Sequence, residues 1–472
     1  MITIKINPQK KYSLGFVGLL TITTLSILSL YYFKPDNLSP KLYDCYYVIV
    51  FQLIIYLFIW CYLFLKKQID VLEPIVLITA IHLLLFIITP IISLYSNEIL
   101  WFDKNLWGGC IKGTWLSTLG YFLLVMGYYS TKQGRKAVTK RRVINFNKIC
   151  KLSLIIWFFC FACNIVYLLS EGKNILYILT LGGNGTVDTE KLNTSAFSFL
   201  GVVSYGMLSA YLYIYQYSNS KLLKLILFYL MISSFLIRGF RFIIVAVIIA
   251  PLIFCYLKKG TRPNIISILV LLIFLAGLVG VIEGARDGLR AGNGMGDSIT
   301  SFLSFEYIKD VLIENFSIYK TYYGIVQNFP LNMDYTYGQL MILYTLVMFI
   351  PRGIWPAKPY PISQEVNAVA VSEYASRAGT AYPYLGEYYH EFGIIGICFF
   401  SFLLGKICGK LKKNMYYKDI HSLVLYSAIC PLLFQIMIRG YTPSNFYMIV
   451  FSILPIIILK KYSIYESKEN LK

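Results

Sequence analysis

The chain has 472 residues, of which 57% are hydrophobic and only 14% are charged, and its formal net charge is +20. An ordinary soluble domain carries roughly 25% charged residues, so this composition excludes such a domain and favours a membrane protein. Most basic residues lie in short loops beside apolar runs, which is the positive-inside pattern. We therefore expect no nucleic-acid partner, although the net charge alone would suggest one.

Apolar runs recur along the whole chain, and a run of roughly 20 residues can cross a bilayer as an α-helix. The sequence therefore predicts an all-α polytopic membrane protein with about 12 transmembrane helices and both termini in the cytoplasm. The predicted spans cover approximately residues 13–33, 44–65, 71–94, 112–129, 149–169, 196–217, 222–237, 242–257, 264–283, 391–408, 420–438 and 444–459.

These spans divide the chain into four parts. Residues 1–283 form a bundle of nine spans, residues 284–389 an outer, extracytoplasmic segment, residues 390–461 the last three spans, and residues 462–472 a cytoplasmic tail. Within the outer segment, residues 338–350 are apolar but too short to span, which predicts a re-entrant or interfacial piece. The segment is also rich in Tyr and Phe. Such rings suit both a membrane-interface belt and stacking on sugars, and the sequence leaves both interpretations open.

Two arginines, Arg238 and Arg241, lie at the tip of the hairpin between the runs 222–237 and 242–257. A cation in hydrocarbon costs ~2.5–3.5 kcal/mol or more, so these residues need an explanation. They either reach lipid phosphates or form an anion site, because guanidinium groups match phosphate oxygens. The predicted outer side carries further cations, namely Arg286, Arg290, Arg352, Lys358, Arg377 and Arg439.

Two of these cation groups have informative spacing. Arg286 and Arg290 are four residues apart, so on a helix they share one face, either as a solvated helix end or as part of a ligand site. Three prolines surround Arg352, Trp355 and Lys358 and fix an extended, bent backbone. We expect this block to hold its two cations and its indole in defined positions at the membrane edge.

The candidate general bases precede the span at 391–408. Glu387 and Glu391 are four residues apart and share a helix face, and His390 is one helical turn from Glu387. A Glu or His at this depth can act as a general base. Alternatively, the acidic residues only stabilise the positive end of the helix dipole. The ten cysteines show neither metal nor disulfide spacing, so we expect small core residues and no metal site.

Three blocks of the sequence are informative together: Arg238-Gly239-Phe240-Arg241, the segment from Pro351-Arg352 to Trp355-Pro356-Ala357-Lys358-Pro359, and Gly386-Glu387-Tyr388-Tyr389 followed by Phe392-Gly393-Ile394-Ile395-Gly396. In this order they resemble the Wzy-type O-antigen and capsule polymerases, the bacterial oligosaccharide repeat-unit polymerases. The resemblance covers roughly residues 200–410. An Arg-then-Gly spacing described for outer loops of some members is absent here.

The resemblance implies a transferase of the bacterial cytoplasmic membrane that is similar to the GT-C class and uses neither metal nor cofactor. Its substrate would be an undecaprenyl-diphosphate-linked oligosaccharide on the outer face, and undecaprenyl diphosphate would be released. The outer cations would neutralise the diphosphate, and Glu387 or His390 would be the base. Membrane lipids and a chain-length regulator are the other candidate partners. The alternatives are an O-antigen ligase-like transferase, a polysaccharide flippase or other transporter, and a non-enzymatic membrane subunit.

Overall fold

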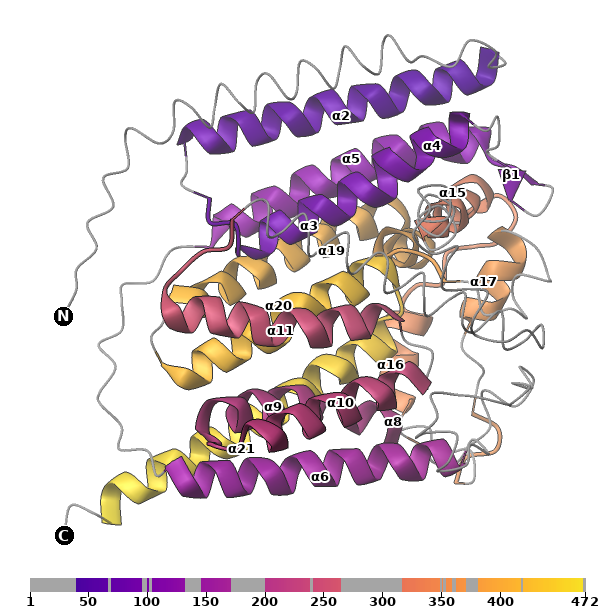
Figure 1. Ribbon diagram of the computed structural model, residues 1–472. Helices are drawn as coiled ribbons and strands as arrows, with labels where there is room; N and C mark the ends of the chain where they lie inside the picture. Colours follow the sequence, from indigo (N-terminus) through magenta and orange to yellow (C-terminus); the bar gives the residue numbers. More distant parts are fainter. Residues whose placement is uncertain are drawn as a thin grey trace, which may run out of the picture.

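The computed structural model is a bundle of long α-helices that run between two ends of the molecule (Figure 1). Seven helices in the described part are long and apolar enough to cross a membrane. The predicted polytopic helical class is thus confirmed. The number of twelve spans stays a prediction, since the spans expected at 13–33 and 264–283 lie outside the described residues. The structure describes residues 40–66, 69–95, 100–101, 104–131, 146–170, 200–237, 241–264, 316–348, 350, 354–358, 362–370, 381–416 and 419–469.

Most described helices coincide with predicted spans, because each apolar run forms one hydrogen-bonded segment in which every backbone group is satisfied. Two of them are interrupted. The run at 71–94 contains a π-helical turn, and the run at 196–217 breaks after its first helix. The helices are α2 (Pro40–Lys66), α3 (Pro74–Leu83), η1 (Leu84–Ile88), α4 (Thr89–Tyr95), α5 (Trp107–Ser130), α6 (Phe146–Ser170), α8 (Leu200–Val203), α9 (Gly206–Tyr217), α10 (Lys221–Ile237), α11 (Arg241–Lys259), α19 (Tyr384–Tyr416), α20 (Ile420–Ile438) and α21 (Thr442–Glu469).

Short elements gather at one end of the bundle, which we call the aromatic end (Figure 1). It also contains the first turns of α19 and α21. A pair of two-residue antiparallel strands is the exception to the predicted all-α fold. The short elements are β1 (Leu100–Trp101), β2 (Lys104–Asn105), α15 (Ile318–Asn328), η3 (Gln339–Tyr344), α16 (Thr345–Val347) and α17 (Ser363–Ala370).

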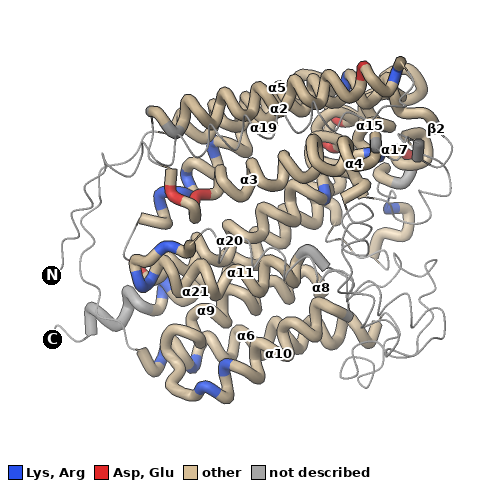
Figure 2. The backbone as a smooth tube through the Cα atoms, turned by 45° about the horizontal axis from the view of Figure 1, so that its top comes forward, with Lys and Arg blue, Asp and Glu red and all other residues tan. Residues whose placement is uncertain are grey.

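Lysine and arginine residues gather at the opposite end, which we call the basic end (Figure 2). Helix α21, the last described helix, ends toward this end (Figure 1). The hairpin of α10 and α11 points the other way, because α10 ends and α11 begins toward the aromatic end (Figure 1). The described cations of the basic end include Lys258, Lys259, Arg262, Lys406, Lys410, Lys412, Lys413, Lys460 and Lys461.

Helices α5 and α19 pack closely because glycines face the partner backbone. A Cβ atom on Gly127 would lie 2.1 Å from the carbonyl oxygen of Phe402, and one on Gly405 would lie 2.0 Å from that of Leu124. Small residues of this kind allow backbones in a membrane to approach each other. The packing fixes α19, and thus its first turn, relative to the rest of the bundle.

Helix α19 begins at Tyr384, upstream of the span that was predicted to start near 391. The hydropathy of the first two turns is low because they contain Glu387, His390 and Glu391, so the apolar pattern marks only the later part. The helix is also kinked. Phe392 (φ −139°, ψ 16°) and Gly393 (φ 61°, ψ −143°) leave the helical conformation.

Candidate functional site

The kink in α19 frees two backbone carbonyls for partners outside the helix. The oxygen of His390 accepts a hydrogen bond from the N–H of Thr336 (2.9 Å), and that of Glu391 accepts one from Tyr337 (3.0 Å). The backbone of Gly393 is in a region that favours glycine. A Cβ atom there would approach the ring of Tyr335 to 2.8 Å. The segment 335–337 is therefore seated directly on the kink.

Glu391 stabilises the start of η3. Its carboxylate accepts hydrogen bonds from the N–H groups of Gly338 (2.5 Å), Leu340 (3.0 Å) and Met341 (3.3 Å). The first N–H groups of a helix lack partners within the helix and carry partial positive charge, so a carboxylate is favourable there. The side chain is fully buried. Glu391 thus ties η3 to the kink of α19.

Glu387 makes the equivalent connection to α21. Its carboxylate accepts hydrogen bonds from the backbone N–H and the hydroxyl of Thr442, each at 2.8 Å, and Thr442 is the first residue of α21. The side chain is 1% exposed. Arg439 ends α20 close by, and its carbonyl accepts a hydrogen bond from the amide of Asn445 (2.7 Å). The structure thus brings Glu387 and Arg439 to the junction of α19, α20 and α21.

His390 lies between two hydroxyl groups. Its Nδ1 is 3.2 Å from the hydroxyl of Thr336, and its Nε2 is 3.2 Å from that of Tyr382. Burial raises the pKa of Tyr382 well above its usual value, and the negative charge of Glu387 adds to the effect. The phenol is therefore neutral. Tyr382 and Thr336 were not predicted, since nothing distinguishes Tyr382 among 41 tyrosines in the sequence.

Lys358 is turned inward rather than toward solvent. Its ammonium donates hydrogen bonds to the carbonyls of Met348 (2.8 Å) and Ile350 (3.1 Å), and the side chain is only 6% exposed. These carbonyls follow α16, where a cation is favourable. The backbone N–H of Lys358 donates a hydrogen bond to the carbonyl of Trp355 (3.0 Å). The side chain of Trp355 is 37% exposed. The described part of the block, residues 354–358, is thus a turn anchored by its lysine.

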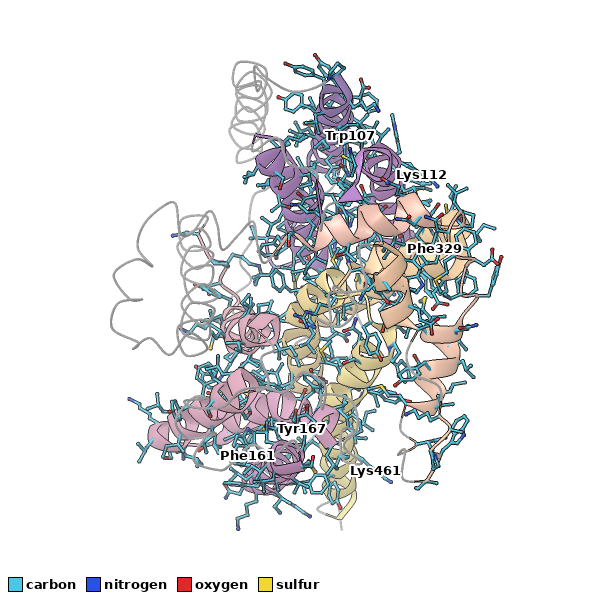
Figure 3. All side chains as sticks on the ribbon, turned by 90° about the vertical axis from the view of Figure 1, so that its right-hand side faces the viewer. Trp107, Lys112, Phe161, Tyr167, Phe329 and Lys461 are labelled. Carbon is cyan, nitrogen blue, oxygen red and sulfur yellow. The ribbon has the colours of Figure 1, made fainter. Side chains whose placement is uncertain are left out.

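A further cation, Lys112 of α5, was not predicted. Its ammonium donates to the carbonyl of Val326 (3.4 Å) and lies 5.2 Å from the ring centre of Tyr389. Figure 3, which looks onto the aromatic end, shows Lys112 and Phe329 close to α15. The carbonyl of Phe329 accepts a hydrogen bond from the hydroxyl of Tyr389 (3.3 Å). Lys112 therefore borders the Glu387–Glu391 turn.

Several predicted site residues lie outside the described part of the chain. Only the backbone of Arg241 is described, as the first residue of α11. Among the described residues, no group of three or more His, Cys, Asp or Glu side chains is arranged to hold a metal ion. The predicted residues that are not described are Arg238, Arg286, Arg290, Arg352 and Arg377.

The fold and this site define a polytopic helical membrane protein with buried acidic and basic groups at an aromatic-rich end. The family model of the O-antigen polysaccharide polymerase Wzy matches residues 16–466, and the protein therefore belongs to that family. The predicted resemblance is confirmed. No curated protein and no solved structure matches the chain. Membership makes the protein a membrane enzyme that polymerises polysaccharide repeat units from lipid-linked oligosaccharides.

Proposed function

We propose that the protein joins undecaprenyl-diphosphate-linked oligosaccharides into O-antigen or capsular polysaccharide on the outer face of the bacterial cytoplasmic membrane. The single observation that carries this proposal is the kinked start of α19, where a carboxylate, an imidazole and the end of α20 with Arg439 meet. The concentration of Lys and Arg at the basic end (Figure 2) supports a cytoplasmic position for that end, where α21 ends. Both termini are cytoplasmic in this proposal. The aromatic end then faces outward.

The reaction is a glycosyl transfer. A hydroxyl oxygen at the non-reducing end of one repeat unit attacks C1 of the reducing-end sugar of the growing chain. The bond between C1 and the diphosphate oxygen breaks, and undecaprenyl diphosphate leaves with the electron pair. The hydroxyl proton passes to a base on the protein. Such a transfer needs a base near the hydroxyl and positive charge near the leaving diphosphate.

Glu387 is the first candidate for the base and His390 is the second. To act as the base Glu387 must be ionised, and an ionised carboxylate has about four lone-pair positions, so the hydrogen bonds from Thr442 leave capacity for a substrate hydroxyl. His390 reaches Tyr382, whose neutral phenol can pass a proton between the imidazole and another group. Both candidates are buried, so the proposal requires the sugar hydroxyl to enter the junction of α19 and α21.

The positive charge comes from the outer cations of the proposed topology, so the transfer uses no metal ion or cofactor. The guanidinium groups bind the diphosphate oxygens. Lys358 contributes by holding the turn after α16, and Trp355 contributes an exposed indole to the glycan. A GT-C-like arrangement and a chain-length regulator as a partner belong to the same proposal. The arginines concerned are Arg238, Arg241, Arg286, Arg290, Arg352, Arg377 and Arg439.

Chain-length analysis of surface polysaccharide in a deletion strain tests this proposal. The strain is complemented with Arg238→Ala or Arg241→Ala, and with Glu387→Gln or His390→Ala. We expect single repeat units from each arginine variant and from the variant that lacks the base, all at wild-type membrane abundance. Lys461→Ala, an exposed cation at the basic end, is the control and keeps the full polymer.

Each negative result removes a defined part of the proposal. Normal polymer from both arginine variants would exclude the diphosphate site at the hairpin. Activity that survives both Glu387→Gln and His390→Ala would exclude both bases. The deletion strain itself separates the alternatives, because loss of a ligase leaves unattached polymer and loss of a flippase leaves repeat units inside the cell.

A further inference from the structure

Tyr337 combines an unusual backbone with an exposed side chain. Its φ angle is +44°, and no other non-glycine residue in the described part of the chain has a positive φ. The side chain is 71% exposed. A bulky residue at positive φ is strained, and such strain persists where the surrounding structure enforces it, often at functional sites. A glycine would adopt this backbone without strain.

The surrounding structure enforces the conformation from both sides of Tyr337. Its own N–H donates to the carbonyl of Glu391 (3.0 Å), and the N–H of Gly338 donates to the Glu391 carboxylate (2.5 Å). On the other side, the N–H of Thr336 donates to the carbonyl of His390 (2.9 Å). Buried groups of α19 thus hold an exposed ring in one place.

The ring of Tyr337 is the first of a row of three neighbouring rings, which we call the tyrosine ledge. The row is formed by Tyr337, Tyr335 and Tyr389. The ring centres of Tyr335 and Tyr337 are 6.2 Å apart, and those of Tyr335 and Tyr389 are 5.9 Å apart. The Lys112 ammonium lies 5.2 Å from the Tyr389 ring centre at the end of the row. Burial raises the pKa of Tyr335 to about 12, so its hydroxyl keeps its proton.

We infer that the tyrosine ledge is a saccharide subsite, in which the ring of Tyr337 stacks on the apolar face of a pyranose of the repeat unit. The C–H groups of a pyranose complement the electron-rich face of an aromatic ring. Tyr335 and Lys112 supply hydrogen-bond donors to the sugar's oxygen atoms. A tyrosine in a membrane-interface belt needs no particular φ angle, so the enforced backbone favours a sugar over a lipid. The assignment deepens the proposed function, because Tyr389 belongs to the turn that carries Glu387 and His390.

The experiment measures binding of the free repeat-unit oligosaccharide, without lipid or diphosphate, to the full-length protein in nanodiscs by calorimetry. Tyr337→Gly relieves the backbone strain, so we expect an equal or higher melting temperature and affinity about tenfold weaker. Tyr337→Leu keeps an apolar side chain and should also bind weakly, whereas Tyr337→Trp should bind well. Tyr47→Leu replaces another exposed tyrosine, 53% exposed in α2, and should bind as wild type.

Wild-type affinity in Tyr337→Gly and Tyr337→Leu would overturn the subsite and leave a membrane-interface role. Because the probe contains no diphosphate, this result does not depend on the proposed donor or on the orientation in the membrane. Weak binding by Tyr337→Gly, together with normal polymer from Glu387→Gln and His390→Ala, would support the subsite and overturn the proposed base. Failure of the subsite alone would leave the proposed transfer intact.

Discussion

The two ends of the bundle bury carboxylates in different ways. At the basic end, Glu73 forms a salt bridge with Lys412 (2.8 Å) and accepts hydrogen bonds from the hydroxyls of Tyr128 (2.9 Å) and Tyr416 (3.1 Å). At the aromatic end, the described partners of Glu387 and Glu391 are backbone N–H groups and a hydroxyl. At the basic end a lysine neutralises the carboxylate charge, whereas at the aromatic end the positive N-termini of helices stabilise it.

This difference indicates different tasks. The salt bridge of Glu73 connects the start of α3 to α19, and its hydrogen bond from Tyr128 connects it to α5. The carboxylates at the aromatic end fix the starts of η3 and α21 relative to the kink. They therefore set the positions of His390 and the tyrosine ledge. We expect substitutions at the basic end to affect stability most, and those at the aromatic end to affect polymerisation most.

Glu73→Ala should have the largest effect on stability. It leaves the Lys412 ammonium and two phenols without their acceptor, and breaking a buried ion pair typically costs ~3–5 kcal/mol. We expect a clear fall in melting temperature and membrane abundance, measured by fluorescence-detected size-exclusion chromatography after heating. Lys410→Ala, which removes an exposed lysine from α19, the helix of Lys412, is the control and should stay near wild type. A wild-type melting temperature for Glu73→Ala would contradict the contrast between the ends.

Gly393→Ala should have the next largest effect on stability and a marked effect on activity. The positive φ of Gly393 and the 2.8 Å approach to Tyr335 predict a loss of roughly 1–3 kcal/mol and a displaced tyrosine ledge. Surface polysaccharide should be shorter than in wild type, as measured by gel electrophoresis. Ile394→Ala, at an exposed neighbour, provides the comparison. Full-length polymer from Gly393→Ala would show that the kink is dispensable.

Glu391→Gln should have the smallest effect of the three. The amide oxygen can still accept the hydrogen bonds from Leu340 and Met341, but the amide nitrogen cannot accept the one from Gly338. One hydrogen bond and the charge at the helix start are lost, which together cost about 1 kcal/mol. We expect a slight fall in melting temperature and a modest shortening of the polymer. If Glu391→Gln lowered the melting temperature as much as Glu73→Ala, the hydrogen bonds from η3 would not account for the contribution of the Glu391 carboxylate to stability.

The apolar pattern alone predicts the position of most helices. The span expected at 420–438 is α20 (Ile420–Ile438), and the span expected at 149–169 lies within α6. Spans of this kind can be predicted because burial in lipid selects a continuous apolar run and requires every backbone group to bond within it.

The geometry of the site depends on contacts between distant segments and could not be predicted. The kink at Gly393 is shaped around Tyr335, and Glu391 caps a helix that begins at Gln339. Lys358 was predicted only to lie on the outer side of the membrane, and the contacts of its ammonium with the carbonyls of Met348 and Ile350 were not predicted. The sequence indicates which side chains are unusual, but their partners follow from the folded chain. Tyr337 carries no local signal, since its strain is visible only in the backbone angles.

The most direct test of this account compares Glu387→Gln with Glu73→Gln in the deletion strain, with expression adjusted to equal membrane abundance. Both substitutions replace a buried carboxylate by an amide of the same shape, one at each end of the bundle. The chain-length distribution of the surface polysaccharide is then measured. We expect single repeat units from Glu387→Gln and a wild-type ladder from Glu73→Gln. A wild-type ladder from Glu387→Gln would contradict its assignment as the first candidate base, and equal loss from both variants would contradict the contrast between the two ends.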